Sequence, residues 1–315
     1  MTHTTIDRLP AGEPGWEGDP GSHVRQALES VSVSVVIPAR NAAERIGRPL
    51  RALATQNYDG WWEVIVADNG STDDTLQRVR EMEGKIPRLR IVDASQRRGA
   101  SHARNVGADA AKGELLLFVD ADDRVGETWL REMAQAAETA DAITGRVRAY
   151  FVRSDETEVL ENESDCLEPV FEFWPSAPAG NFGIWAEVFD EIGGFNEEYR
   201  VCEGVEIAWR LRAAGHTVRF VWEGVLDSYE RRTGRGIVKQ SYTSGQGYPH
   251  LYRDFRGLGM PRYGVVRTLR YSVRRYVRDA WKLLRTERGR REWLRGVAWR
   301  VGCLVGSIRY RVVCP

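Results

Sequence analysis

The sequence predicts a doubly wound α/β fold followed by a basic helical extension. Apolar runs rich in β-branched residues alternate with helical patterns in units of roughly 30 residues, which is typical of strand–helix–strand units in a largely parallel sheet. One run, Leu115 to Val119, has five consecutive apolar residues and is expected to be buried on both faces of that sheet. From Glu230 onward, 21 Lys and Arg stand against 5 Asp and Glu, and apolar residues recur at helical spacing.

Each element follows from its local pattern. Residues 1–30 are rich in Gly, Pro and charge and are expected to form a flexible leader. Short apolar runs predict four strands, at residues 31–37, 62–67, 89–92 and 115–119. Helical patterns cover residues 46–54, 101–112 and 127–140, and Pro49 predicts a kink or a late start in the first of them. A further strand is expected from Ala142 to Phe151.

Composition narrows the class of protein. The net charge is zero, but the basic tail from Glu230 has a charge near +16 and the preceding part near −16. The four cysteines lack the spacing of a zinc site or a disulfide framework. The sequence shows no signal-peptide pattern and no run near the ~18 apolar residues of a membrane span. We therefore expect a cytoplasmic protein that touches a surface.

Three carboxylates follow the central strand: Asp120, Asp122 and Asp123. In open α/β sheets, ligands gather beyond the carboxyl ends of the strands. Crowded anions repel unless a cation lies between them, and oxygen ligands suit Mg²⁺ or Mn²⁺, which would hold a diphosphate. The alternative is that Asp122 and Asp123 cap the helix that begins near Glu127. Neither a G-x-G-x-x-G motif nor a P-loop is present, so phosphates must be held by a metal and side chains.

Six segments occur in the order and spacing of family-2 glycosyltransferases: VVIPARN, VADNGSTDDT, RRGASHARNVGADAAKGELLLFVDADD, NFGIW, IGGFNEEY and CEGVEIAWRLRAAGH. The resemblance covers roughly Val31 to Thr233. It implies a GT-A fold over residues 31–235, with a nucleotide-binding half at 31–123, an acceptor half at 124–235, and the basic extension at 236–315. It also implies an inverting transfer from a nucleotide-diphosphate sugar, expected to be a UDP-sugar, to a hydroxyl acceptor in cell-envelope polysaccharide or glycolipid synthesis.

The resemblance assigns roles in the nucleotide half. It implies that Pro38, Arg40 and Asn41 line the base and ribose pocket, although Arg40 is equally well explained as a solvated cation. Asp68 would accept a hydrogen bond from a pyrimidine imide, or else form an Asx-turn in Asp-Asn-Gly. Arg104 would bind the diphosphate, or else pair with the acidic cluster. Asp120 would contact the ribose as half of the family's metal-binding pair, and Asp122 the metal.

The acceptor half departs from the family at its expected base. Family members carry Glu-Asp where this chain has Glu203-Gly204, and the missing Asp is the family's catalytic base. Glu203 is the predicted replacement, and Glu206, one helical turn later, is the second candidate. Trp174, Asn181 and Phe182 are candidates for a sugar site, with packing as the alternative for the aromatic rings. Gly194 would let the backbone pass close to the donor sugar.

The basic extension contains two amphipathic patterns, Val266 to Leu284 and Trp293 to Val312. They predict attachment to the inner face of an anionic membrane, which would bring the site to a lipid-linked or saccharide acceptor. Packing on the acidic catalytic domain or on a second copy is the alternative. No nucleic-acid recognition motif accompanies the basic charge, so nucleic acid is not expected as a partner. Two rival functions remain: a silent nucleotide-sugar-binding paralogue, which Gly204 favours, and a nucleotidyltransferase.

Overall fold

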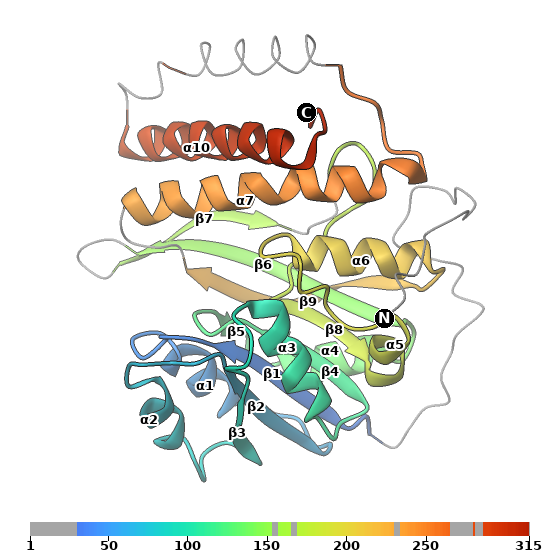
Figure 1. The fold of residues 1–315 in the computed structure, drawn as a ribbon. Helices are drawn as coiled ribbons and strands as arrows, with labels where there is room; N and C mark the ends of the chain where they lie inside the picture. Colours follow the sequence, from blue (N-terminus) through green and yellow to red (C-terminus); the bar gives the residue numbers. More distant parts are fainter. Residues whose placement is uncertain are drawn as a thin grey trace.

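The computed structural model describes residues 30–152, 157–164, 169–229, 234–264, 280 and 286–314. Two sequence predictions lie outside these residues: the leader, apart from Ser30, and the helix expected from Val266 to Leu284, apart from Ala280. In the described part, a nine-stranded mixed sheet has helices packed on it, and two long helices lie beyond one end of the sheet (Figure 1).

The first half of the sheet is parallel, as the sequence predicts. β1 (Val33–Ala39) lies between β2 (Trp62–Asp68) and β4 (Leu115–Val119), and β3 (Leu89–Asp93) lies beside β2. Every residue of β2 and β4 is buried, which explains why their sequences are nearly continuously apolar. The carboxyl ends of these parallel strands meet at one edge of the sheet.

The second half of the sheet is mixed. β8 (Asn181–Trp185) pairs antiparallel with β4, and the sheet continues through β6 (Ala142–Val152), β9 (Val218–Tyr229) and the two-residue β5 (Arg124–Val125). β7 (Glu158–Ser164) pairs with β6. Asn181 and Phe182 are sugar-site candidates in the sequence, whereas the structure buries the whole stretch NFGIW as a central strand.

Short helices connect the strands: α1 (Gly47–Leu53), α2 (Thr75–Arg80), α3 (Ala100–Asp109), α4 (Trp129–Ala137), α5 (Ala186–Glu191) and α6 (Glu203–Ala213). Pro49 lies in the first turn of α1, where its missing N–H removes no helical hydrogen bond, so the late helix start is confirmed. α3 packs against β1 and β2, and Gly107 allows the close approach because a Cβ there would lie 2.4 Å from Val36 Cγ1. This packing places the beginning of α3 beside the carboxyl ends of the strands.

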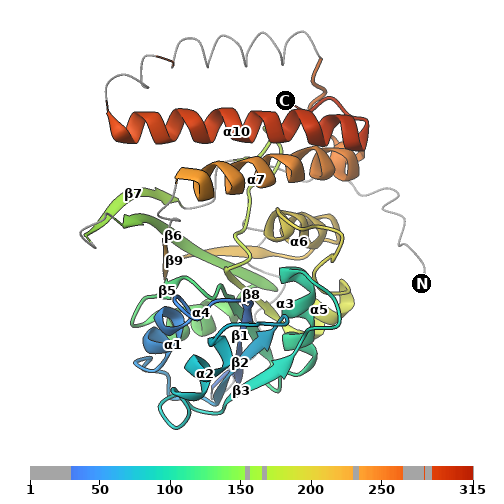
Figure 2. The same cartoon turned by 60° about the vertical axis from the view of Figure 1, so that its left-hand side comes forward.

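Two long helices form a layer over the acceptor half. α7 (Gly234–Phe255) and α10 (Glu287–Tyr310) run side by side, with α10 on the outside (Figures 1 and 2). Glycines permit their close contact, since a Cβ at Gly245 would lie 2.0 Å from Trp299 O and one at Gly302 would lie 2.1 Å from Tyr242 O. α10 confirms the second amphipathic pattern, whereas the sequence analysis did not predict α7. None of the helices in the described ranges is long and apolar enough to cross a membrane.

Candidate active site

A cavity of about 400 Å³ lies at the carboxyl end of β1, between the loop that follows this strand and the beginning of α3. Its wall includes six of the residues predicted from the sequence: Pro38, Arg40, Arg104, Asp120, Asp122 and Glu203. These residues come from four separate parts of the chain, and the fold brings them together. The cavity therefore combines carboxylates with arginines, as a site for a metal-bound or arginine-bound diphosphate requires.

Arg104 joins two of the carboxylates. Its Nη1 donates to Glu203 Oε1 at 2.9 Å, and its Nη2 donates to Asp120 Oδ1 at 2.5 Å. The Arg104 side chain is only 2% exposed, whereas Asp120 is 39% exposed and therefore accessible from the cavity. Burial alone would lower the pKa of Arg104, but the two carboxylates outweigh burial and raise this pKa. The salt bridge to the acidic cluster, given as the alternative from the sequence, is thus present.

The other two carboxylates of the cluster have different surroundings. Asp122 is 35% exposed, and its Oδ2 lies 3.5 Å from Arg45 Nη1. Asp123 is buried and bonds to the Ser228 side chain and the Tyr229 backbone; burial, together with the charges of Asp120 and Asp122, raises its pKa.

The helix-capping alternative for Asp122 and Asp123 does not hold, because Thr128 occupies the N-cap of α4 and no side chain caps it. Asp227, a further buried carboxylate on β9, accepts from Arg124 and Arg148. Among the residues that the structure describes, no group of three or more His, Cys, Asp or Glu side chains could hold a metal ion.

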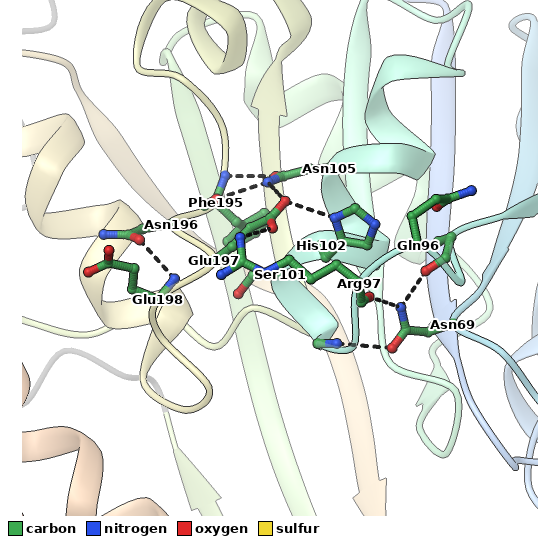
Figure 3. Close-up of polar contacts among 12 residues, drawn as sticks. Asn69, Gln96, Arg97, Ser101, His102, Asn105, Phe195, Asn196, Glu197 and Glu198 are labelled. Atoms are coloured by element: carbon green, nitrogen blue, oxygen red, sulfur yellow. Dashed lines mark hydrogen bonds and ion pairs between the residues drawn. The ribbon is translucent and has the colours of Figure 1, made fainter. Parts of the chain in front are cut away.

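A polar network fixes the helix that carries Arg104. Asn105 exchanges two hydrogen bonds of 2.9 Å with the backbone of Phe195 (Figure 3). His102 Nδ1 lies 2.9 Å from Glu197 Oε1, and Arg97 donates to the other oxygen of Glu197 at 2.7 Å. α3 is therefore tied to the loop that follows α5, which holds Arg104 in position relative to Glu203.

Asn41 and Asp68 tie together the loops after β1 and β2. Asn41 accepts the Thr72 N–H at 2.8 Å, and both oxygens of Asp68 accept the Ser71 N–H at 3.2 Å. The Asx-turn alternative for Asp68 is therefore observed. Neither residue belongs to the described cavity wall, so their predicted nucleotide contacts remain predictions.

Glu203 and Glu206 both belong to α6 but have different partners. Glu203 lies on the cavity wall beside Arg104, with 15% of its side chain exposed. Glu206 is buried, and its two oxygens accept from Arg210 at 2.8 and 2.9 Å. Arg210 also donates to Gly194 O at 2.7 Å, so Glu206 supports the turn at Gly194. The two candidates are therefore distinguished, because only Glu203 is part of the cavity wall as described.

Gly204 has no room for a side chain. A Cβ at this position would lie 2.2 Å from Ala177 O and 2.4 Å from Ala179 N, both of which are backbone atoms. An aspartate at Gly204 would therefore require the segment 177–179 to move. The glycine that replaces the family aspartate at position 204 thus accompanies the close approach of the backbone of segment 177–179.

The four candidate sugar contacts lie outside the described wall of this cavity: Trp174, Asn181, Phe182 and Gly194. The Asn181 amide is fully engaged inside the sheet, where it accepts from Trp129 Nε1 and donates to Arg146 O and Gly224 O. Trp174 stacks on Phe173 with ring centroids 4.1 Å apart. Asn181 therefore has a hydrogen-bonding role within the fold and Trp174 packs against Phe173, and their contacts with a sugar stay predictions. Gly194 has a φ of 68°, a conformation that favours glycine, and its proximity to the donor sugar stays a prediction.

Two cavity residues were missed in the sequence analysis. Arg45 reaches Asp122, and Asn69 accepts the Gly99 N–H at 3.0 Å, which positions the loop before α3. Asn69 adjoins Asp68 in the turn already singled out, so its proximity to the site was a usable signal. Arg45 follows the predicted pocket segment, but its sequence does not distinguish it from the other exposed arginines.

Comparison with known sequences identifies one protein family that matches this chain. The profile of the family described as Glycosyl transferase family 2 matches residues 34–198, just over half of the chain. AglE of Haloferax volcanii is 28% identical over 228 residues, which cover 68% of this chain and 72% of AglE. TarS of Staphylococcus aureus, a poly(ribitol-phosphate) β-N-acetylglucosaminyltransferase, is 36% identical over 103 residues, which cover 32% of this chain and 18% of TarS.

Solved structures show the same fold. The mannosyltransferase PcManGT of Pyrobaculum calidifontis, in complex with GDP-Man and Mn²⁺, has a TM-score of 0.58 at 16% identity and covers 96% of this chain and 91% of its own. Residues 1–349 of S. aureus TarS, in complex with UDP-GlcNAc, have a TM-score of 0.53 at 16% identity, and the match covers 89% of this chain and 92% of the TarS chain. These likenesses confirm the predicted GT-A fold and its helical carboxyl-terminal part.

Proposed function

Because the chain belongs to glycosyl transferase family 2, we propose that it is an inverting glycosyltransferase that uses a nucleotide-diphosphate sugar. A UDP-sugar is the proposed donor, and the acceptor is a hydroxyl of a saccharide or lipid-linked molecule of the cell envelope. UDP-GlcNAc and GDP-Man in the complexes of TarS and PcManGT support a donor of this class. The observation that carries the proposal is the cavity in which Arg104 joins Asp120 to Glu203.

The cavity offers charge for a diphosphate. Arg40, Arg45 and Arg104 line it, and guanidinium groups bind phosphate oxygens in bidentate geometry. Asp120 and Asp122 would hold Mg²⁺ or Mn²⁺. Two partly exposed carboxylates fit such an ion, because Mg²⁺ is commonly bound by one or two carboxylates together with substrate phosphates. The ion would neutralise charge on the departing diphosphate.

Glu203 is the proposed base. Its carboxylate would take the proton of the acceptor hydroxyl while the acceptor oxygen attacks the anomeric carbon and the nucleoside diphosphate leaves. Arg104 keeps this carboxylate oriented through a hydrogen bond of 2.9 Å. Glu203→Gln retains the shape and removes the base, so turnover should fall by about 10²-fold or more while UDP affinity stays within severalfold. Glu81→Gln, at an exposed ion pair at the end of α2, is the control. Turnover within severalfold of wild type would remove Glu203 from this role.

Metal dependence has a separate test. Calorimetry should detect UDP binding with Mn²⁺, and chelation or Asp122→Asn should weaken that binding by at least about tenfold. Arg45 contacts Asp122, so Arg45→Gln serves as a comparison for the loss of that ion pair alone. UDP affinity unchanged by chelator would exclude the metal. Binding of UDP-sugars without turnover on any acceptor would favour the silent-paralogue alternative.

The proposed location is the inner face of an anionic membrane. α10 exposes apolar side chains along its length, including Leu294, Val301, Leu304, Val305 and Ile308, and the last of these is 80% exposed. The tail that contains α10 is strongly basic, and each Lys or Arg near an anionic leaflet contributes on the order of 1 kcal/mol. The protein should co-sediment with vesicles containing phosphatidylglycerol and not with neutral vesicles, and salt should weaken this binding.

The exposed face of α10 provides the variant for this test. Leu304→Ser with Ile308→Ser removes apolar area without changing charge and should reduce vesicle binding. Wild-type protein that stays in the supernatant with anionic vesicles would exclude the membrane. Binding unaffected by the double variant would exclude α10 as the attachment face.

A further inference from the structure

A second and larger cavity lies between the sheet and the two long helices. Its volume is about 680 Å³, and its wall comes from β6, β9, α7 and α10. Residues that define it include Ser228, Tyr229, Ser241, Tyr248, Trp299 and Arg300. This size is within the range of small-molecule sites. None of its described lining residues belongs to the described wall of the cavity around Arg104.

The lining of this cavity suits a saccharide. Tyr248 and Trp299 pack edge to face, with ring centroids 5.1 Å apart, and both contribute to the wall. Ser241, which is only 9% exposed, and Ser244 add hydroxyl groups, and Gln240 adds an amide. Aromatic rings provide flat apolar surfaces, and hydroxyl and amide groups hydrogen-bond to sugar hydroxyls.

Arg300 adds a cation with two unsatisfied donor atoms. Its Nε and Nη1 are buried, and neither has a hydrogen-bond partner in the described structure. The guanidinium lies 5.1 Å from the ring centroid of its neighbour Trp299. Buried guanidinium nitrogens without an acceptor are costly, so an anionic ligand would supply the acceptor that these two atoms lack among the described residues.

The other charged groups of the cavity are differently placed. Arg295 lies 3.9 Å from Glu161, which also accepts from Arg291, so both of these cations share a carboxylate. Glu292 lies on the wall and is exposed. Arg300 is therefore the cation with free donors on this wall, among the residues described.

The cavity adjoins the acidic cluster through β9. Ser228 and Tyr229 line the cavity, and the same two residues bond to Asp123, which follows Asp122 in the chain. Ser228 and Tyr229 would thus lie between Asp123 and a molecule in this cavity. The second substrate of a transferase must reach the donor from a neighbouring site.

We propose that this cavity binds the acceptor, and that the acceptor is a saccharide carrying a phosphate group held by Arg300. This inference rests on the proposed function for the identity of the occupant. The phosphate could belong to a soluble sugar phosphate or to a lipid-linked saccharide diphosphate, and both present the same chemistry to Arg300.

Binding of simple probes tests the inference on the full-length protein. Calorimetry should show that the protein binds glucose 1-phosphate more tightly than it binds glucose or inorganic phosphate. Arg300→Gln should weaken sugar phosphate binding by about tenfold or more, because the charged donor is lost. Arg290→Gln, at an exposed arginine of the same helix, should leave it unchanged. Equal binding of inorganic phosphate and sugar phosphate, or sugar phosphate binding unaffected by Arg300→Gln, would overturn the inference.

Two further measurements separate this inference from its alternatives. UDP affinity should be unchanged in Arg300→Gln; failure of wild-type protein to bind UDP would instead overturn the proposed function. The melting temperature of Arg300→Gln should equal or exceed that of wild type, because an unpaired buried cation is removed. A fall in melting temperature would give Arg300 a structural role.

A water-soluble short-chain lipid-linked saccharide diphosphate that binds more tightly than glucose 1-phosphate would identify the lipid-linked source, and the reverse order would identify the soluble one.

Discussion

The carbonyl oxygen of Ala177 lies 2.2 Å from the position that a Cβ would occupy at Gly204. Contact with a backbone atom at this distance cannot be relieved by rotating a side chain. Gly204 lies in the first turn of α6, immediately after Glu203. The close approach of segment 177–179 therefore leaves no room for the family aspartate at position 204. Glu203 is the carboxylate that remains on the cavity wall.

Gly204→Ala should destabilise the protein by about 1–3 kcal/mol, measured by urea unfolding, because the added methyl group displaces backbone. The expected sign is diagnostic, since Gly→Ala inside a helix otherwise stabilises by roughly 0.5–1 kcal/mol. Gly257→Ala is the control, because nothing lies within 4 Å of its Cβ position and its φ is not positive. Gly204→Asp should lower turnover for the same steric reason. Turnover well above wild type would indicate a degraded enzyme that had lost its aspartate.

Arg104→Lys should reduce kcat/KM by about 10²-fold. The lysine retains the charge but cannot donate to Asp120 and Glu203 simultaneously with the fork of a guanidinium. Steady-state kinetics would measure the loss, with Arg78→Lys at an exposed ion pair as the control. A loss below about threefold would show that the Asp120–Arg104–Glu203 arrangement is not needed for the reaction.

The nucleotide half could largely be predicted from the sequence. Buried parallel strands carry continuous apolar runs, and Asp120 and Asp122 follow the most apolar one. Because the carboxyl ends of such strands share one edge, the position of these residues beside Pro38 and Arg40 follows from topology. Arg104 could be anticipated in the site, but its buried bridge to Glu203 depends on how α3 and α6 pack together.

The acceptor half could not be predicted in the same way, because its contacts are between distant segments. Asn181 resembles a sugar-binding amide in sequence, but its partners lie on α4, β6 and β9. The spacing of Glu203 and Glu206 places them on one helix face, yet Arg210 engages only Glu206. α7 contains Pro249 and four glycines that obscure its helical pattern, although Gly245 is required for contact with α10.

Asn181→Ala should destabilise the protein by about 2–4 kcal/mol, since it leaves the buried Trp129 N–H and two backbone carbonyls without their partner. The KM for the donor should stay within about twofold in the fraction that remains folded. Asn162→Ala, at an exposed position of β7, is the matched control and should be neutral. An unchanged unfolding midpoint together with a raised KM would restore Asn181 as a sugar contact.

His216 should stabilise the fold only over a defined range of pH. Its Nδ1 lies 3.6 Å from Asp141 and its Nε2 lies 3.4 Å from Glu191, and Thr217 also donates to Asp141. The Asp141 carboxylate, which accepts from the protonated imidazole, raises the pKa of His216 above 6.5, so the contribution of His216 is complete below pH 6.5 and is lost as pH rises through the raised value. Burial alone would raise the pKa of Asp141, but His216 and Thr217 outweigh it and lower this pKa below 3.8, so the contribution of Asp141 is lost only as pH falls. The pair should therefore be most stabilising between about pH 4 and pH 6.5.

Urea unfolding should show His216→Gln to be less stable than wild type by about 1–2 kcal/mol near pH 5.5, and the difference should shrink at about pH 8.5. Equal destabilisation at both pH values would mean that His216 acts through packing, independently of its charge.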